Sequence, residues 1–247
     1  MQTSRALIAL AEHLVERLRR LSFGPPVTHV YNPLEYAWGP HREYLERFGR
    51  GRKRVLFLGM NPGPFGMVQT GVPFGEVAAA RDWMGIRAAV LQPKLQHGKR
   101  PIQGFACPRS EVSGRRLWGF FATQFGSPGN FFKEHLVMNY CPLAFLEESG
   151  KNRTPDKLAP EEREALHAAC DEHLLGVVKA VQPEWVVGVG GFARDRATLV
   201  CGENGPARIT TILHPSPASP AANRDWAGSV LKQLHAAGVW HGPEEGR

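Results

Sequence analysis

Short apolar runs recur along the chain, and each is followed by a polar or glycine-rich turn. Runs of this length, rich in Val, Ile and Leu, are typical of strands in a parallel sheet that is buried on both faces. We therefore predict strands at residues 54–59 (RVLFLG), 135–143 (HLVMNYCPL), 184–190 (EWVVGVG) and 208–213 (RITTIL).

Segments with helical spacing of apolar residues lie between these runs. Pro160 suits the first position of one helix, and Glu161 and Glu162 suit its first turn. Strands that alternate with helices indicate an α/β fold with a parallel sheet covered on both faces. The predicted helices cover residues 3–21, 41–49, 76–85, 113–126, 160–181, 191–200 and a last segment that ends near 238.

The two ends of the chain receive separate predictions. Residues 1–23 predict an amphipathic helix packed on a single domain of residues 1–247, and residues 240–247 predict a flexible tail. Glu12, His13 and Glu16 interrupt the apolar core that a signal peptide would need. No apolar run approaches the roughly 18 residues of a membrane helix, so we expect a cytoplasmic protein without a membrane partner.

Composition narrows the classes of partner. Lys and Arg number 30 against 23 Asp and Glu, a formal net charge of +7, which suits a polyanion and nucleic acid first. A basic protein with no such partner remains an alternative. The four cysteines form no Cys-x-x-Cys pair, so neither a zinc knuckle nor an iron–sulfur cluster is indicated, and reduced structural thiols are expected.

Polar side chains follow several of the predicted strands. Ligands of open α/β sheets bind at the carboxyl ends of the strands, so Asn61, Asn139 and His214 could converge. The amide of Asn61 could orient a water, and the imidazole of His214 could stabilise negative charge on a leaving group. The alternatives are a turn-forming Asn-Pro and a packed histidine.

Further residues could recognise a nucleotide. The amide of Asn139 could read the edge of a pyrimidine, or it could pair with neighbouring backbone. Phe74 could stack on a base or belong to the core. Lys151 and Arg153, in the loop 149–155, could hold phosphates or form a solvated surface.

Several motifs together resemble one enzyme family. GMNPGPFGMVQTGVPFGE (59–76), HPSP (214–217), SEVSGRRLW (110–118), NYCPL (139–143) and SGKNRTP (149–155) are similar to the single-strand-selective monofunctional uracil-DNA glycosylases. This is family 3 of the uracil-DNA glycosylase superfamily, and the resemblance covers roughly residues 24–235. It implies a three-layer α/β/α sandwich around a short, mostly parallel four-stranded sheet. We expect a bacterial member, at the nucleoid.

The resemblance also implies an activity. The family flips uracil, or oxidised uracils such as 5-hydroxymethyluracil, out of single- or double-stranded DNA and hydrolyses the N-glycosidic bond. Free uracil and an abasic site are the products, without a lyase step. The resemblance implies no cofactor and no metal, and we expect a monomer.

Roles for individual residues follow by motif. Asn61 would position the attacking water, and His214 would stabilise the departing uracil anion. Glycine at position 63 would leave room for a 5-substituent where other branches carry tyrosine. Met60 would supply backbone contacts, Phe74 would stack on the base and Asn139 would pair with its edge. The residues expected to contact DNA are Lys151, Asn152, Arg153, Pro215, Ser216, Pro217, Ala218 and Arg224.

One departure from the family pattern concerns the segment after HPSP. Vertebrate members carry Arg-Asn-Pro there, whereas this chain has Ala218-Ser219-Pro220. Alanine cannot fill the position of an extruded base. Either Arg224 or the proline-rich loop fills it, or duplex activity is weaker than single-strand activity; we predict the latter.

Two other functions remain as alternatives. A mismatch-specific glycosylase would share the Asn-Pro-Gly motif but carry Asn-Pro-Ser in place of His214-Pro215-Ser216. A non-catalytic protein that binds uracil-containing DNA would keep the pocket without turnover.

Overall fold

The computed structural model describes residues 2–202 and 205–241, and a parallel sheet lies at its centre. Within these ranges the sheet has four strands in the order β3 (His135–Asn139), β2 (Val55–Gly59), β6 (Trp185–Val189) and β7 (Arg208–Ile212). All neighbouring pairs are parallel, and Gly59 pairs in register with Asn139. Every residue of the two inner strands is buried, as their continuous apolar runs predicted.

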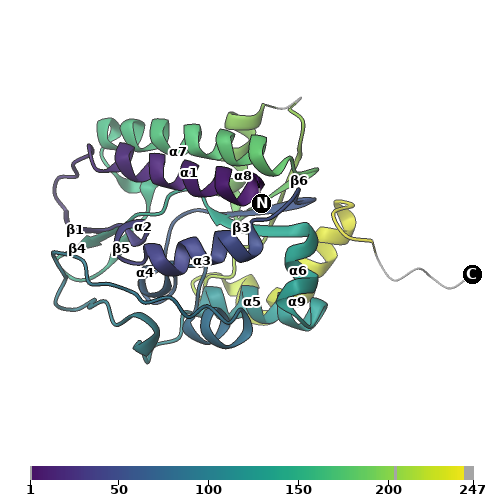
Figure 1. Ribbon diagram of the computed structural model, residues 1–247, viewed down its shortest axis with the longest axis horizontal. Coiled ribbons are helices and arrows are strands. Elements are labelled where there is room, and N and C mark those ends of the chain that lie inside the picture. The colour runs from purple at the N-terminus through teal and green to yellow at the C-terminus, as the bar shows by residue number, and fades with distance from the viewer. Residues whose placement is uncertain (1, 203–204, 242–247) are drawn as a thin grey trace, which may run out of the picture.

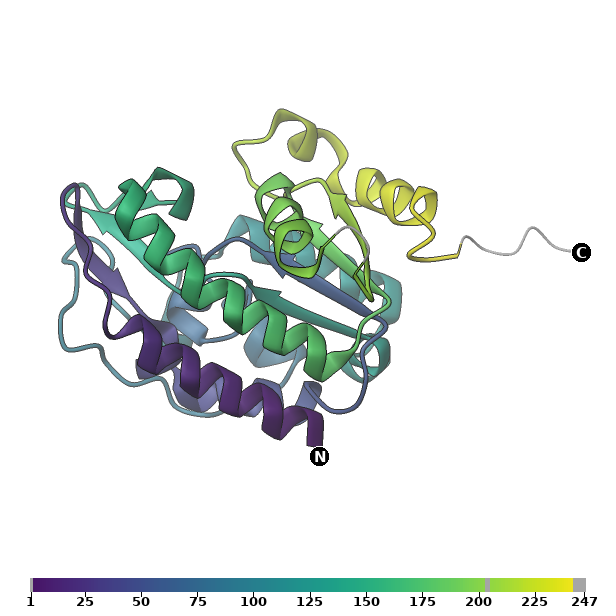
Figure 2. The ribbon, with the colours of Figure 1, turned by 90° about the horizontal axis from the view of Figure 1, so that it is seen from above.

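Helices cover both faces of this sheet, which confirms the three-layer α/β/α architecture (Figure 1). On one side lie α7 (Pro160–Val181) and α8 (Gly191–Cys201), with α1 (Gln2–Leu18) alongside α7. The same pairing of α1 and α7 is seen from above in Figure 2. The other side carries α5 (Val112–Phe125), α6 (Pro128–Glu134) and α9 (Pro220–Ala236).

A small antiparallel sheet was not predicted. In the described part of the chain it joins β1 (Val27–Tyr31), β4 (Ala144–Glu147) and β5 (Asn152–Arg153). No strand was predicted over residues 27–31 or 144–147, and residues 149–155 were expected to form a loop, which was wrong for β5. These strands are short and lie among prolines and turn residues, so their hydrophobic pattern carries little signal.

Shorter helical pieces complete the fold. The helix predicted over 76–85 covers residues 77–83, most of it a π-helical turn at Ala79–Trp83, and the helix predicted over 41–49 starts earlier. The remaining pieces are α2 (Pro33–Tyr36), α3 (Trp38–Phe48), α4 (Met67–Thr70) and 3₁₀ turns at Gly104–Ala106 and Pro155–Lys157.

Both ends of the described chain pack against the rest of the protein. Helix α1 buries Leu7, Leu14 and Leu18 and packs on α7 and α3. At the other end Trp240 is buried, and its indole N–H donates to Nε2 of His135 at 3.0 Å. The expected flexible tail over 240–247 is therefore wrong at its first residue, and its residues 242–247 lie outside the described residues. None of the described helices is both long enough and apolar enough to traverse a bilayer.

Candidate active site

A cavity of about 160 Å³ opens at the carboxyl ends of β2 and β3 and reaches the loop after β7. The structure thus brings Asn61, Asn139 and His214 to one place, although 153 positions separate the first from the last. The residues that line the cavity are Met60, Asn61, Pro62, Gly63, Met67, Phe74, Glu111, Ser113, Asn139, Asn152, Thr154 and His214.

The loop that carries Asn61 is held rigidly by its neighbours. The backbone N–H of Cys141 donates to the carbonyl of Met60 at 2.9 Å, and Nδ2 of Asn152 donates to the carbonyl of Pro62 at 2.9 Å. Nδ2 of Asn61 itself donates to the carbonyl of Leu143 at 3.2 Å. That bond fixes the amide and leaves its Oδ1 available to accept a hydrogen bond from a water.

The protonation of His214 follows from its contacts. The backbone N–H of Ser216 donates to Nδ1 of His214 at 3.1 Å, so Nδ1 presents a lone pair. Burial lowers the pKa of His214, which keeps the imidazole neutral at pH 7. A neutral ring with an acceptor at Nδ1 carries its proton on Nε2, so His214 offers one N–H donor to the cavity.

Phe74 and Asn139 meet over a glycine. A Cβ on Gly59 would overlap the ring of Phe74 and lie 2.5 Å from Oδ1 of Asn139, so only glycine fits at the end of β2. Phe74 has a positive φ of 52°, an uncommon conformation for a bulky residue. Strain of this kind persists where the surroundings over-determine it. Here it holds a flat ring at the cavity wall, 8% exposed and 6.4 Å from the ring of His214.

Asn139 has an incomplete set of hydrogen bonds. Its Nδ2 donates to Sδ of Met67 at 3.2 Å, whereas its Oδ1 is buried and finds no partner among the described residues. An unsatisfied buried acceptor costs about 1–3 kcal/mol. The amide edge is therefore prepared for a ligand that donates a hydrogen bond.

Glu111 was missed by sequence reasoning. It precedes α5, but its side chain makes no capping hydrogen bond and instead lines the cavity. Burial first, and then the charge of Glu76, raise the pKa of Glu111 to about 7. The segment around Glu111 lacks regular periodicity, and only the glycine at position 114, in the first turn of the helix, hints at a close approach.

The HPSP loop is fixed from helix α5. Nη1 of Arg116 donates to the carbonyls of Pro215 and Ser216 at 3.1 and 3.4 Å, and its Nη2 donates to Oδ1 of Asn223 at 2.9 Å. Oγ of Ser216 accepts from the backbone N–H of Ala218 at 3.1 Å. These bonds hold the segment that follows His214 in one conformation.

The outer rim of this loop is open. Pro217 and Ala218 are exposed, whereas Pro215 is buried. Arg224 is also exposed, in the first turns of α9, just before a break in helical geometry at Asp225 (φ −157°, ψ 84°).

The loop 149–155 has a different charge distribution from the expected one. Lys151 is exposed, but Arg153 pairs with Glu147 at 3.3 Å and donates to the carbonyl of Lys157 at 2.7 Å. Both polar atoms of the Asn152 amide bond to backbone, at Pro62 and at Phe145. Arg153 and Asn152 therefore shape the loop, and Lys151 is its exposed cation.

Additional basic residues lie beside this loop. Lys99 and Arg100 pack against Gly150, and the guanidiniums of Arg100 and Arg109 lie 5.5 and 4.1 Å from the centre of the Phe65 ring. Phe65 belongs to the Asn-Pro-Gly loop itself. Positive charge is thus collected next to the cavity, and side chains of this kind commonly contact phosphates.

Comparison with known proteins identifies the family. The model of the uracil DNA glycosylase superfamily matches residues 46–235. The chain is 50% identical over 223 residues to the single-strand selective monofunctional uracil-DNA glycosylase of Rattus norvegicus, covering 90% of this chain and 80% of the relative. The chain belongs to this family. The Bos taurus member is 48% identical over 227 residues, which cover 92% of this chain and 84% of the relative.

The fold of the glycosylase agrees with a solved neighbour. The crystal structure of Pedobacter heparinus SMUG2 superposes with a TM-score of 0.67, covering 93% of this chain and 97% of the neighbour at 19% sequence identity. In residues 2–202 and 205–241, no group of three or more His, Cys, Asp or Glu side chains is arranged to hold a metal ion.

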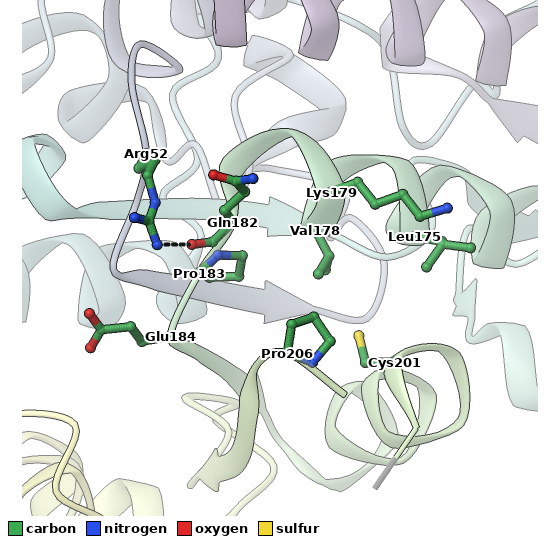
Figure 3. Close-up of a pocket in the computed structure, with 9 residues that line it drawn as sticks. All are labelled: Arg52, Leu175, Val178, Lys179, Gln182, Pro183, Glu184, Cys201 and Pro206. Atoms are coloured by element: carbon green, nitrogen blue, oxygen red, sulfur yellow. Dashed lines mark hydrogen bonds between the residues drawn. The ribbon is translucent and has the colours of Figure 1, made fainter. Parts of the chain in front are cut away.

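A second, larger cavity of about 790 Å³ lies at the opposite, amino-terminal edge of the glycosylase sheet (Figure 3). Arg52 precedes β2 there, Glu184 precedes β6, and Nη2 of Arg52 donates to the carbonyl of Gln182 at 3.4 Å. None of the predicted site residues lines it. Position at the carboxyl ends of the strands, rather than volume, therefore identifies the active site.

Proposed function

We propose that this protein is a monofunctional uracil-DNA glycosylase that hydrolyses the N-glycosidic bond of uracil in DNA. The observation that carries the proposal is the meeting of Asn61, Asn139 and the neutral His214 in one cavity at the end of a parallel sheet. Each presents the hydrogen-bonding atom that the reaction needs, and the family relationship supports the same activity.

Recognition begins with the extruded base. Phe74 stacks on one face of the uracil, and Oδ1 of Asn139 accepts a hydrogen bond from N3–H. This pairing satisfies the acceptor that finds no partner among the described residues. Cytosine carries an unprotonated N3, so it leaves Oδ1 of Asn139 unsatisfied and is disfavoured.

Bond cleavage then depends on the leaving group. As the C1′–N1 bond breaks, negative charge develops on the uracil ring and its O2. The Nε2–H of His214 donates to that oxygen, and removal of one such preorganised donor typically costs about 10²–10³-fold in rate. Because its ring is neutral, His214 stabilises this oxygen by donating a hydrogen bond and does not have to transfer its proton.

The attacking water is positioned rather than strongly activated. Oδ1 of Asn61 accepts a hydrogen bond from the water, while the bond from its Nδ2 to Leu143 keeps the amide in place. An amide is not a strong base, so orientation of the water and stabilisation of uracil carry the rate.

The proposal extends to the range of substrates, the product, the oligomeric state and the contacts with DNA. Both single- and double-stranded DNA are substrates, oxidised uracils such as 5-hydroxymethyluracil are accepted, and free uracil is released by a monomer. Lys99, Arg100, Arg109 and Lys151 contact the phosphates. A bacterial source and action at the nucleoid in the cytoplasm stay predictions.

Base release from an oligonucleotide with a single uracil tests the function. Hot alkali converts abasic sites into strand breaks, so cleavage is read on a gel. We expect the wild type to release uracil, and Asn61→Ala and His214→Ala each to lose about 10²-fold or more. Uracil-DNA that is bound but left intact by the wild type would instead make the protein a damage-binding module.

The mismatch-specific alternative predicts another substrate profile. Such an enzyme would require a mismatched duplex and leave single strands uncut. Such enzymes carry Asn-Pro-Ser where this chain has His214-Pro215-Ser216, and this difference favours the uracil glycosylase.

A further inference from the structure

Tyr140 follows Asn139 directly after β3 but does not line the cavity. Tyr140 is 1% exposed, and its Oη donates to Oδ1 of Asp171 in α7 at 2.7 Å. Nη2 of Arg196 in α8 donates to the other carboxylate oxygen, Oδ2. Burial raises the pKa of Tyr140 well above its ordinary value, so the phenol keeps the proton that it donates. A side chain beside the active site is thus bonded to both helices on that face of the sheet.

Asn139 and Tyr140 point to opposite sides of the same backbone. The amide of Asn139 contacts Sδ of Met67 and lines the cavity, whereas the ring of Tyr140 packs edge-on against Phe192 of α8, with centroids 5.7 Å apart. Consecutive side chains of an extended strand alternate in this way. Because the two residues share one backbone, a rotation of Tyr140 also tilts the amide edge of Asn139.

The backbone that follows Asn139 holds the loop that carries Asn61. The backbone N–H of Cys141 donates to the carbonyl of Met60, and the carbonyl of Leu143 accepts from Nδ2 of Asn61. This short stretch of chain therefore carries one amide of the site and fixes the other. A displacement of the stretch would be passed to both amides.

The ion pair between Asp171 and Arg196 is a costly way to hold two helices together. Their side chains are 28% and 15% exposed, and Nε of Arg196 is buried with no hydrogen-bond partner among the described residues. Apolar residues of similar volume often stabilise such a position equally well or better. The charged pair adds direction instead, because the carboxylate accepts from the guanidinium and from Tyr140 in a defined geometry.

We propose that Tyr140, Asp171 and Arg196 are positioning residues that align the amides of Asn139 and Asn61 with the extruded uracil. The inference rests on the proposed function. None of the three positioning residues lines the cavity, so they act on the reaction only through the two amides. Their loss should lower kcat and weaken binding of the free base, and it should leave KM for DNA almost unchanged.

Tyr140→Phe is the most conservative test, because it removes only the phenolic O–H. We expect kcat on single-stranded uracil DNA to fall about 10-fold, since a misplacement of 1 Å can cost about 100-fold. KM should stay within about twofold, because the residues expected to contact phosphates lie elsewhere. Inhibition by free uracil should weaken by about threefold or more, because Asn139 then meets the base less well.

Substitutions of Arg196 separate the ion pair from the packing of α8. Arg196→Met should resemble Tyr140→Phe, whereas Arg196→Lys keeps the positive charge beside Asp171 and should recover most of the activity. The matched control is Arg194→Met, which breaks an exposed pair with Asp195, 2.6 Å long, on the same helix and should leave kcat unchanged. Tyr140→Phe keeps the test decisive if Arg196→Met does not fold.

The Asn139→Ala background distinguishes positioning from a general structural role. Tyr140→Phe should cost about threefold or less in kcat there, because one of the two amides that it aligns is already gone. An equal loss in both backgrounds, or a loss confined to KM, would overturn the proposal. So would wild-type kcat in Tyr140→Phe. Wild-type protein that releases no uracil would refute the proposed function and this inference with it, whereas an active wild type with an unaffected Tyr140→Phe variant refutes the inference alone.

Discussion

The backbone N–H of Ser216 donates to Nδ1 of His214 at 3.1 Å, and this bond directs the other ring nitrogen into the cavity as a donor. Protonation of Nδ1 would remove the lone pair that accepts this bond. The active form of the ring is therefore the neutral one, and burial favours that form by lowering the pKa of His214.

The contribution of His214 to uracil release should accordingly be almost independent of pH between about 7 and 9 and should decline only below about 6.5, the ordinary pKa of histidine. The sign follows from the lowered pKa, since acidification must pass that ordinary value before the buried ring binds a proton. The measurement is kcat on single-stranded uracil DNA across pH 5–9. His214→Gln should be less active than the wild type. Its kcat should not decline at acid pH, because the side chain of glutamine does not titrate.

Arg116 should matter for activity although it lines no part of the cavity. It connects α5 to the carbonyls of Pro215 and Ser216, so its removal frees the loop that orients His214. We expect Arg116→Ala to reduce kcat by about 10-fold, on the scale of a small misplacement of a catalytic group. Arg115→Ala is the control, because Arg115 is exposed on the same helix. Equal kcat values for the two variants would contradict this role.

Acid should destabilise the fold through buried histidines. Burial lowers the pKa of His41, His135 and His173 to about 4. The folded state therefore binds fewer protons than the unfolded chain, and stability is full above pH 6.5 and is lost as pH falls from 6.5 towards 4. Each histidine contributes on the order of 2–3 kcal/mol to this loss.

His173 offers the cleanest test of that linkage. Its Nε2 is buried and has no hydrogen-bond partner in the described ranges, so replacement by leucine removes a titrating group at little cost in hydrogen bonding. In thermal unfolding, His173→Leu should raise the Tm relative to wild type more at pH 5 than at pH 7.5. A shift that is the same at both pH values would show that His173 does not contribute to the acid sensitivity.

DNA affinity should depend on Lys151 and Arg100 more than on Arg153. The guanidinium of Arg153 is already paired with Glu147, whereas Lys151 is exposed. Loss of one phosphate contact should reduce the slope of log K against log salt by about 0.7 on single strands. Fluorescence anisotropy from 50 to 300 mM salt would measure this for Lys151→Ala and Arg100→Ala. Arg5→Ala, on the exposed face of α1, should leave the slope unchanged.

Single-stranded DNA should be cut faster than a U·A duplex. Ala218 is exposed at the rim of the HPSP loop and carries no side chain long enough to replace an extruded base. Base extrusion from a duplex costs a few kcal/mol, which the protein must offset by contacts. Ala218→Arg should therefore raise duplex activity relative to single-strand activity. Equal or faster cleavage of the U·A duplex by the wild type would count against this view.

The central fold could be predicted because its hydrophobic signal is local. Each inner strand is buried on both faces, so its residues form an unbroken apolar run. That run indicates both that the segment is a strand and where the strand begins and ends. Strand β5 has two residues and pairs with β4 through a tight turn, so no periodicity exists for it to show. The small sheet was missed for that reason.

The site residues also differ in whether the local sequence predicts them. Asn61, Asn139 and His214 follow predictable strands, and the topology of a parallel sheet brings strand ends together. Glu111 follows an irregular stretch, and only tertiary packing brings it against Gly63 and Gly66. The pairing of Arg153 with Glu147 was equally out of reach, because a charged residue in a loop has the same sequence signature whether it is free or paired.

The segments that build the cavity are far apart along the chain: residues 60–74, 111–113, 139–154 and 214. No fragment of the chain contains a working subset of them. Excision of uracil consequently reports that all four segments are in place: during refolding from denaturant, activity should return only when the last of them has packed. For the cell this means that a partly folded chain, still basic enough to adhere to DNA, would not create abasic sites.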